Sequence, residues 1–388
     1  MRAKLRALFV SVILMSTAAC VDNSRGGGDP VPAPVETLPP PVTEVPPPET
    51  PPEQPPAQRP EATLESALLQ SADTVIVPTV ERFADRARQL VNAGSDFCAG
   101  PDEVSLSDVQ DAWRGVFAEW YRVSLYNFGP LNDDLVFPPF TFIDSLRLRG
   151  TDYLESVRGE IASDIADDRV LDDEYFGRKT FQFVGLLALE SAIFETSTSD
   201  LSAAPADIVA EYEFQPRKCE VLQGLAGQLN TRAQTIRDKW VVEFPQTGGP
   251  YRSIYLSGEL EDGTASFAQL FISGQEFLDY LQARRVVLTA ARVSDFAWDA
   301  IAAAIDEVEL LLRGTATATD SIFAVMEDTG NQNEVDAVEE SLRQVRQAIA
   351  DRDADMLEIT LGFLDGNYKR EIPDALGIQL GINFSDGD

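Results

Sequence analysis

The segment Ser107–Asn127, SDVQDAWRGVFAEWYRVSLYN, determines the fold class that the sequence predicts. Its large apolar side chains recur every three or four residues, which is the spacing of one face of an α-helix. Ser105, with Asp108 three residues later, predicts the start of this helix, and Gly129-Pro130 predicts its end. The apolar face consists of Val109, Trp113, Val116, Phe117, Trp120, Val123 and Tyr126.

The same helical period continues through most of the chain after residue 62. The stretch Arg217–Trp240 has apolar residues at similar spacing, and Pro216 predicts its start because proline is tolerated in the first turn of a helix. Ser294 is placed to cap a helix over 295–313. No stretch alternates long enough to predict a sheet, so we expect an all-α fold of packed helical bundles. Further periodic stretches cover 64–92, 264–291, 333–350 and 353–365.

A break in the helical pattern predicts two halves within this body. The tetrapeptide Thr247-Gly248-Gly249-Pro250 contains the residues that most strongly interrupt helices. We therefore expect an N-terminal helical half over 63–247 and a C-terminal helical half over 251–388.

The ionisable residues exclude several classes of function. The 388 residues include 64 Asp and Glu, 31 Lys and Arg and no His, which gives a formal charge of −33. Without histidine there is no Ser-His-Asp triad, Cys-His pair, His-ligated zinc or proximal-His haem. The acidity opposes nucleic-acid binding, which needs clustered basic side chains to neutralise phosphates.

The N-terminus predicts export and lipid attachment. A basic start precedes an apolar run over 7–15, which has signal-peptide length and is too short to span a bilayer. The small residues before Cys20 resemble the lipobox of bacterial lipoproteins, in which the cysteine is diacylated and becomes the mature N-terminus. We expect a signal peptide over 1–19 and lipidation at Cys20, with an ordinary secretory signal as the alternative. Because Val21 follows the cysteine, lipoprotein sorting rules favour the outer membrane, with the protein facing the periplasm.

Residues 20–62 form a proline-rich segment between the lipidation site and the helical body. Of the chain's 24 prolines, 14 lie between Pro30 and Pro60. Such a composition cannot bury a core and favours solvated polyproline II. Some 40 residues of this kind reach about 100 Å, so we expect a semi-rigid tether. A docking ligand for a partner protein is the alternative.

Two cysteines remain besides Cys20. In an exported protein, an even pair such as Cys98 and Cys219 more often forms a disulfide than remains reduced. The loop that this bond closes is long, and the chain-entropy model then predicts a stabilisation of about 4–5 kcal/mol. Two free thiols are the alternative.

Glu190 is the one carboxylate whose position needs a special explanation. It lies inside Phe181–Phe194, FQFVGLLALESAIF, which is apolar on all sides of a helix and is therefore expected to be buried. A buried carboxylate is costly unless it is paired, hydrogen-bonded or protonated. Either Glu190 pairs with an arginine, or it lines a polar pocket and contacts a metal or ligand. The candidate arginines are Arg114, Arg122 and Arg178.

The chain resembles the imelysin family, which is grouped with bacterial insulin-cleaving membrane proteases. The resemblance covers about 65–388 and rests on the order and spacing of several short motifs, together with the lipoprotein-type leader. These motifs are Ala112-Trp113-Arg114, Glu119-Trp120, Phe128-Gly129-Pro130, Gly185-Leu186-Leu187-Ala188-Leu189-Glu190, Arg217-Lys218-Cys219 leading to Trp240, and the C-terminal stretch from Leu376 to Asp388.

The resemblance implies two helical bundles with a pocket between them and an iron-linked role in the bacterial envelope. The family signature is Gly-x-His-x-x-Glu, to which Gly185 and Glu190 conform, whereas Leu187 occupies the histidine position. A subset of imelysin-like proteins has the same Gly-Leu-x-Ala-Leu-Glu form. We expect the binding site to include Glu190, Trp113, Arg114 and Glu119.

The loss of the signature histidine weakens the case for a metallopeptidase. Leucine has no lone pair, and a catalytic metal typically needs about three protein ligands and an open position. Carboxylates still suit hard cations such as Ca²⁺ or Fe³⁺, with Glu190 as a candidate ligand. We therefore expect a non-enzymatic lipoprotein that binds a metal, a metal complex or an envelope partner in iron uptake. A peptidase with carboxylate ligands only and a structural adaptor with a vestigial pocket are the alternatives.

Overall fold

The computed structural model describes residues 61–134, 136–149, 151–199, 201–245, 247–315 and 320–380. The predicted signal peptide, the lipidation site Cys20, the proline-rich segment up to residue 60 and the C-terminal residues 381–388 lie outside the described residues. In the part that is described, no helix is both long and apolar enough to cross a membrane.

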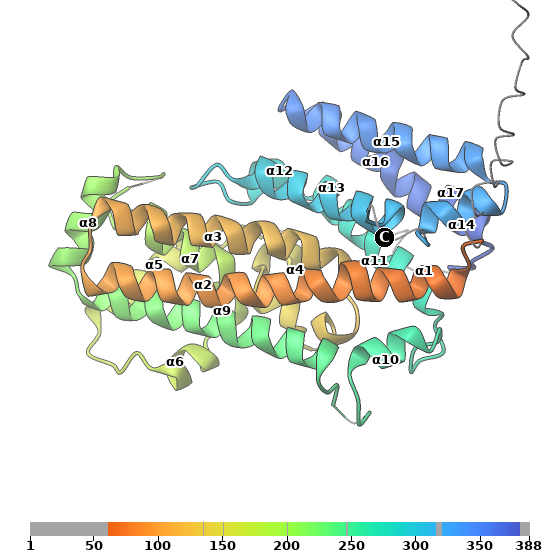
Figure 1. Ribbon diagram of the computed structural model, residues 1–388. Helices are drawn as coiled ribbons and strands as arrows, with labels where there is room; N and C mark the ends of the chain where they lie inside the picture. The colour runs from red at the N-terminus through yellow and green to blue at the C-terminus, as the bar shows by residue number, and fades with distance from the viewer. Residues whose placement is uncertain are drawn as a thin grey trace, which may run out of the picture. The chain divides into compact units, whose positions relative to one another are not determined.

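Helices dominate the described residues, which contain two isolated β-bridges and no strand, and the all-α prediction is confirmed (Figure 1). The helices are α1 Leu64–Gln70, α2 Val77–Ala99, α3 Glu103–Val123, α4 Ser145–Arg149, α5 Leu154–Ala166, α6 Asp173–Arg178, α7 Gly185–Phe194, α8 Pro205–Phe214, α9 Arg217–Val241, α10 Tyr251–Leu256, α11 Ser266–Ala283, α12 Val286–Thr289, α13 Ala297–Arg313, α14 Ile322–Asp328, α15 Gln332–Ala350, α16 Ala354–Lys369 and α17 Glu371–Leu376. Short 3₁₀ turns are η2 Ser124–Tyr126, η3 Gly129–Leu131, η4 Pro139–Phe142 and η5 Phe181–Phe183.

The first helical stretch is continuous from α1 into α2 and includes a π-helical segment, η1 Ser71–Ile76. Pro78 lies in the first turn of α2, immediately after this segment. A proline inside a helix removes one backbone hydrogen bond and clashes with the carbonyl four residues earlier. The wider π-helical turn is a known way for a helix to absorb such a local disruption.

Helix α3 buries the aromatic face that the sequence predicts, but its ends differ from the prediction. The N-cap is Asp102, whose side chain accepts from the Ser105 backbone N–H at 2.7 Å, and Ser105 completes the capping box instead of starting the helix. The helix ends at Val123, before Gly129, because η2 continues the chain in a tighter turn. In contrast, α9 begins at Arg217 directly after Pro216, as predicted.

One group of helices packs around α2, which lies along both α3 and α9 (Figure 1). Helix α7 contacts α3, α5 and α9 from this group. The disulfide between Cys98 and Cys219 joins the end of α2 to the start of α9, with a Cα–Cα distance of 5.6 Å. The predicted pairing is therefore confirmed, and it fixes two helices that already share a long interface.

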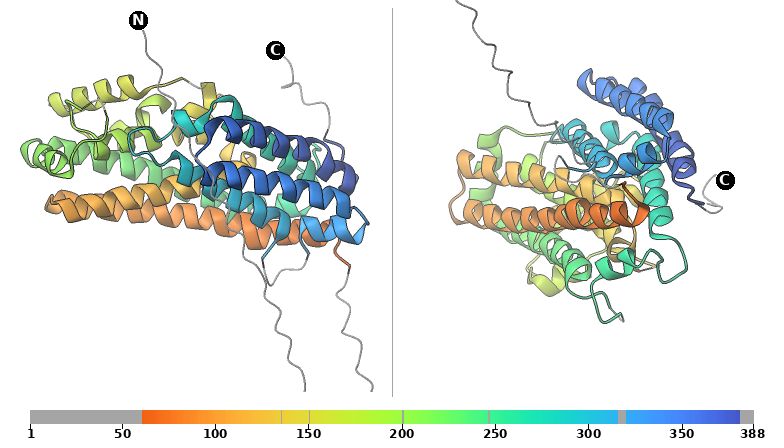
Figure 2. Two further views of the ribbon diagram at one scale, coloured as in Figure 1. Left: turned by 90° about the horizontal axis from the view of Figure 1, so that it is seen from above. Right: turned by 45° about the vertical axis from the view of Figure 1, so that its right-hand side comes forward.

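A second group comprises α11, α13, α15 and α16, in which α16 packs against both α11 and α15 (Figure 2). Helix α13 also packs on α3, so the apolar core continues from one group into the other. The predicted boundary at 247–250 lies in the turn between α9 and α10. The predicted break in the helical pattern is therefore present as a turn. The division of the body into two halves stays a prediction.

Candidate functional site

The entry into α7 depends on a residue without a side chain. Gly185 has φ +81°, and a Cβ built there would lie 2.5 Å from the Ile143 carbonyl oxygen. The next backbone N–H, from Leu186, donates to that same oxygen at 3.0 Å. The Trp113 indole N–H donates to the Leu186 carbonyl at 3.1 Å. Gly185 and Trp113 therefore hold the first turn of α7 against the rest of the fold, and this fixes where Glu190 lies.

Glu190 is held by donors from a loop about one hundred residues later in the chain. Its Oε1 accepts from the Val293 backbone N–H at 3.0 Å, the Ser294 backbone N–H at 2.8 Å and the Ser294 hydroxyl at 2.8 Å. This loop connects α12 to α13. Ser294 is therefore not the cap of α13, which begins at Ala297 after Phe296, because its hydroxyl donates to Glu190 instead.

None of the three arginines proposed as partners of Glu190 pairs with it. Arg114 pairs with Asp111, Arg122 pairs with Asp306 and the more distant Glu119, and Arg178 pairs with Glu174. Backbone and hydroxyl donors therefore take the place of the expected guanidinium. The other carboxylate oxygen, Oε2, accepts no hydrogen bond from any residue that the structure describes.

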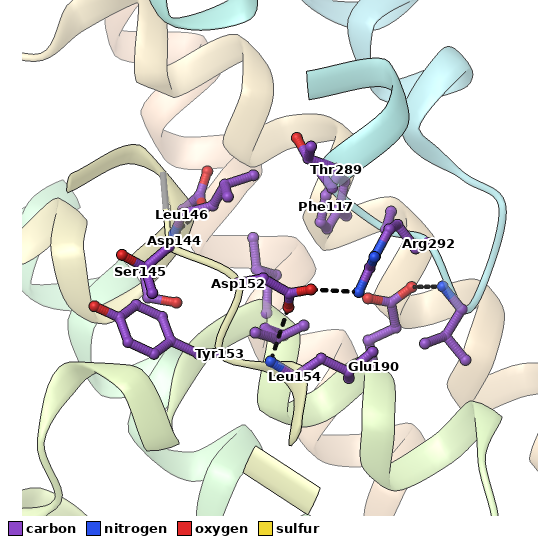
Figure 3. Close-up of a pocket in the computed structure, with 16 residues that line it drawn as sticks. Phe117, Asp144, Ser145, Leu146, Asp152, Tyr153, Leu154, Glu190, Thr289 and Arg292 are labelled. Carbon is purple, nitrogen blue, oxygen red and sulfur yellow. Dashed lines mark hydrogen bonds and ion pairs between the residues drawn. The ribbon is translucent and has the colours of Figure 1, made fainter. Parts of the chain in front are cut away.

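A cavity of about 80 Å³ lies beside Glu190 (Figure 3). Most of its wall is apolar, and the polar side chains on it include three carboxylates and one guanidinium. The lining residues are Phe117, Asp144, Ser145, Leu146, Thr151, Asp152, Tyr153, Leu154, Leu186, Leu187, Glu190, Thr289, Ala290, Ala291, Arg292 and Val293.

Burial controls the protonation of the carboxylates in this cavity. It raises the pKa of Glu190 to about 7, although the donors from Ser294 and Val293 lower the pKa. Burial also raises the pKa of Asp144, which accepts from the Tyr280 hydroxyl at 2.9 Å and the Trp120 indole N–H at 3.4 Å. Asp152 pairs with Arg292 at 2.6 Å on the cavity wall (Figure 3). Glu190 differs from these two carboxylates, because its Oε2 has no hydrogen-bond partner among the described residues.

Two of the three signature positions, Leu187 and Glu190, line this cavity. Leu187 and Glu190 are three residues apart on α7, so they share a face, and both line the cavity. Leu187 adds apolar surface where the signature would supply an imidazole. Across the described residues, no three Cys, Asp or Glu side chains come together in a way that could hold a metal ion.

The other three predicted binding residues, Trp113, Arg114 and Glu119, lie at three different positions in the fold. Trp113 lies next to the cavity through its contact with Phe117, at a ring distance of 4.9 Å. The Arg114 guanidinium lies 5.1 Å from the Phe194 ring centroid and does not reach Glu190. Glu119 belongs to another cluster, where it accepts from Arg82 Nε at 3.2 Å.

That second cluster is built around Glu307 on α13, which the sequence analysis missed. Glu307 Oε1 accepts from the Thr79 hydroxyl at 2.6 Å and the Tyr126 hydroxyl at 2.8 Å. Its Oε2 lies 3.6 Å from Arg82 Nη2 and 3.7 Å from Arg122 Nη1. Burial raises the pKa of Glu307, and the hydroxyl donors and the two arginines lower it. A signal was present: Glu307 interrupts an apolar helix face formed by Ala300, Ala304, Val308 and Leu311.

Comparisons with known proteins agree with this fold. The imelysin family model, also named Peptidase M75, matches residues 76–377, so the chain belongs to the imelysin family. An imelysin-like protein from Psychrobacter arcticum 273-4 has a similar structure, with a TM-score of 0.64 and 16% identity, covering 82% of this chain and 96% of that one. The search of curated proteins gives no match.

A second solved structure is also similar. It comes from Parabacteroides distasonis ATCC 8503 and is provisionally named an iron-regulated protein A precursor. Its TM-score is 0.52 and its identity 13%, with coverage of 80% of this chain and 94% of that one. At such low identities, both structures support the fold. The family carries a peptidase name.

Proposed function

We propose that this protein is a non-enzymatic ligand-binding protein of the bacterial envelope. In this proposal Cys20 carries the lipid anchor, residues 20–62 tether the body to the outer membrane, and the cavity beside Glu190 binds a small cationic metal complex. The proposed role is in iron uptake, where the protein works with other envelope proteins. The iron-regulated name of one structural neighbour and the family membership support this role.

The observation that carries the proposal is the free oxygen of Glu190. Its Oε1 is fully used by the Val293 and Ser294 donors, while Oε2 has no donor among the described residues. Oε2 is not among the fully buried atoms, so it is open to the cavity that Glu190 lines. A ligand in the cavity can donate a hydrogen bond to Oε2 or coordinate to it. Asp144 lies on the same wall, and so do Asp152 and Arg292, which pair with each other.

A bare metal ion fits this cavity less well than a complex. A protein site for a hard cation usually supplies six to eight oxygens for Ca²⁺ or several for a transition metal. Here Glu190 offers one free oxygen, Asp152 is already paired with Arg292, and Asp144 is already hydrogen-bonded to Tyr280. A complex brings most of its ligands with it and needs only one carboxylate contact and apolar walls.

The same donor set supports the non-enzymatic part of the proposal. Water activation by a catalytic metal needs the metal held by about three protein ligands. Leu187 removes the imidazole of the signature, and Glu190 keeps only one oxygen available. We therefore do not assign peptidase activity to this chain, although its family carries a peptidase name.

Isothermal titration calorimetry tests the proposal. The probes are Fe³⁺ bound by one acetohydroxamate, and then Fe²⁺, Zn²⁺ and Ca²⁺ as bare ions. The proteins are the wild type, Glu190→Gln, and the control Glu213→Gln, in which the same change is made at an exposed position on α8. We expect the ferric complex to bind the wild type and the control equally and to bind Glu190→Gln at least tenfold more weakly.

Three results would contradict parts of this proposal. Equal binding to the wild type and Glu190→Gln removes Glu190 from the site. Tight binding of bare Zn²⁺ favours a metal site formed by the protein alone. Chelator-sensitive cleavage of a denatured protein substrate, absent from Glu190→Gln, establishes the peptidase alternative.

A further inference from the structure

A second, larger cavity lies between α4 and α11 and opens at the surface. Its volume is about 350 Å³, and it shares no lining residue with the Glu190 cavity. Tyr280 lines the larger cavity and donates to Asp144, which lines the smaller one, so this hydrogen bond lies between them. The larger cavity is lined by Asn127, Phe140, Arg147, Glu276, Asp279, Tyr280, Ala283 and Arg284.

Arg147 is the central cation of this cavity, and it forms no ion pair within 4 Å among the described residues, although Asp144 and Glu276 lie close enough to act on its charge. The guanidinium lies 5.5 Å, 5.6 Å and 5.5 Å from the ring centroids of Phe140, Phe277 and Tyr280. Its Nη1 donates to the Ser124 carbonyl at 2.7 Å. Neither Nε nor Nη2 meets an acceptor in the part of the chain that is described. Burial lowers the pKa of Arg147, while the nearby Tyr280, Asp144 and Glu276 raise it.

The aromatic surroundings of Arg147 hold the guanidinium in place without neutralising it. Cation–π contacts contribute about 0.5–2 kcal/mol each, and they leave the N–H groups at the edge of the guanidinium free to donate. A guanidinium with free N–H groups suits a carboxylate, which it can bind through two parallel hydrogen bonds.

The opposite polarity is present on the same wall. Asn127 is 6% exposed, and its side-chain oxygen Oδ1 has no donor among the described residues. Glu276 and Asp279 are three residues apart on α11 and both line the cavity. Glu276 and Asp279 are exposed and present acceptors to a ligand, whereas Arg147 presents donors.

The charges on this wall balance, in a protein whose formal charge is −33. Two cationic side chains, Arg147 and Arg284, face two carboxylates, Glu276 and Asp279. A simple anion would be repelled by the carboxylates, and a simple cation would be repelled by the arginines. A ligand with one charge of each sign satisfies both groups.

We propose that this cavity binds a small zwitterion, namely a free α-amino acid. The ligand's carboxylate binds the Arg147 guanidinium, and its ammonium group binds Glu276 and Asp279. The side chain of the amino acid extends towards the surface. This site is independent of the Glu190 cavity and of the role proposed for it.

The experiment uses calorimetric titration of the folded wild-type chain with the twenty common amino acids. Sodium acetate and methylammonium chloride serve as half-ligands that carry only one of the two charges. We expect at least one amino acid to bind, and both half-ligands to bind at least tenfold more weakly than that amino acid. If no amino acid binds, or if acetate alone binds equally well, the proposal is wrong.

The variant Arg147→Gln is expected to weaken amino-acid binding at least tenfold. The matched control is Arg232→Gln, because Arg232 also lies over an aromatic ring, 4.1 Å from the Phe142 centroid, and its Nε also lacks a partner among the described residues. Arg232 does not line the cavity, so the control should bind like the wild type. Unchanged binding by folded Arg147→Gln, or equal losses in both variants, overturns the proposal.

A second variant covers the case in which Arg147→Gln does not fold. Glu276 and Asp279 are exposed, so the double variant Glu276→Gln/Asp279→Asn is expected to fold. It should bind the amino acid at least tenfold more weakly than the wild type, without losing affinity for acetate. Full retention of amino-acid binding by this variant also overturns the proposal.

Discussion

Glu190 on α7 and Glu307 on α13 are two buried glutamates, with exposed fractions of 1% and 0%. In each of them Oε1 accepts short hydrogen bonds. They differ in what faces Oε2: two arginines lie within 3.7 Å of the Glu307 oxygen, and a cavity lies beside Glu190. The ion-pair explanation first considered for Glu190 therefore describes Glu307.

This difference separates a structural carboxylate from a candidate binding group. The Glu307 cluster connects α2, α3 and α13, which belong to the two groups of helices. Removing one member of such a cluster leaves the others buried without partners. Among the described residues, no arginine or lysine pairs with Glu190, so its charge stabilises the fold less than that of Glu307 and is available to a ligand.

The largest effect that we expect comes from Glu307→Ala. The substitution deprives the Thr79 and Tyr126 hydroxyls of their acceptor and leaves Arg82 and Arg122 beside a void. We expect the free energy of unfolding to fall by about 3–5 kcal/mol. Urea denaturation followed by circular dichroism measures it. A loss below about 1 kcal/mol would show that the cluster is not structural.

The second largest effect that we expect is on the pH dependence of stability, part of which Glu190→Gln removes. The folded pKa of Glu190 is about 7, above its ordinary value of 4.5, so the native state binds more protons than the unfolded state between these values. Wild-type stability therefore falls as the pH rises through this window, and glutamine abolishes that part of the fall. Between pH 5 and pH 8, we expect Glu190→Gln to gain about 2–3 kcal/mol relative to the wild type.

Urea denaturation of both proteins at half-unit pH intervals tests this expectation. The comparison isolates Glu190, because Asp144, Asp152, Glu195 and Arg292 around it are the same in both proteins. Glu213→Gln serves as the exposed control and should follow the wild type. A constant difference between Glu190→Gln and the wild type across the range would rule out a raised pKa for Glu190.

A matched pair of smaller substitutions removes one hydroxyl donor from each glutamate. Thr79→Val takes the 2.6 Å donor from Glu307, and Ser294→Ala takes one of three donors from Glu190. We expect losses of about 1–2 kcal/mol and about 1 kcal/mol, respectively. Ser294→Ala should also move the pH midpoint of the Glu190 titration upwards, because a donor that favours the charged form is gone. Equal pH profiles for Ser294→Ala and the wild type would contradict that contact.

The sequence allowed much of the fold to be predicted, for physical reasons that can be named. The period of the apolar residues in Ser107–Asn127 and Arg217–Trp240 reports which helix face is buried, and both helices are present. The Cys98–Cys219 disulfide was predicted because an exported protein with two cysteines besides the lipidated one usually pairs them. An apolar run around one acidic residue was enough to predict that Glu190 is buried.

The sequence did not predict which groups hold the buried glutamates. Glu190 is held mainly by the backbone N–H groups of Val293 and Ser294, and every non-proline residue carries such a group. Charge alone therefore favoured arginines that pair elsewhere. Glu119 was assigned to the binding site from its motif, and in the structure it pairs with Arg82 beside Glu307. Glu307 itself could have been found, because it interrupts an apolar helix face.

The smallest expected effect on stability comes from Leu187→His, which restores the family signature. Leu187 is partly buried and faces a cavity, so the exchange should cost about 1 kcal/mol or less. The informative change is in metal binding. An imidazole at position 187 lies on the same face of α7 as the Glu190 carboxylate, and the pair supplies nitrogen and oxygen ligands to a transition metal. Calorimetry should then detect Zn²⁺ binding to Leu187→His that is lost in Leu187→His/Glu190→Gln. If Leu187→His binds Zn²⁺ no better than the wild type, position 187 does not control metal binding, and the contrast between Glu190 and Glu307 rests on the free Oε2 alone.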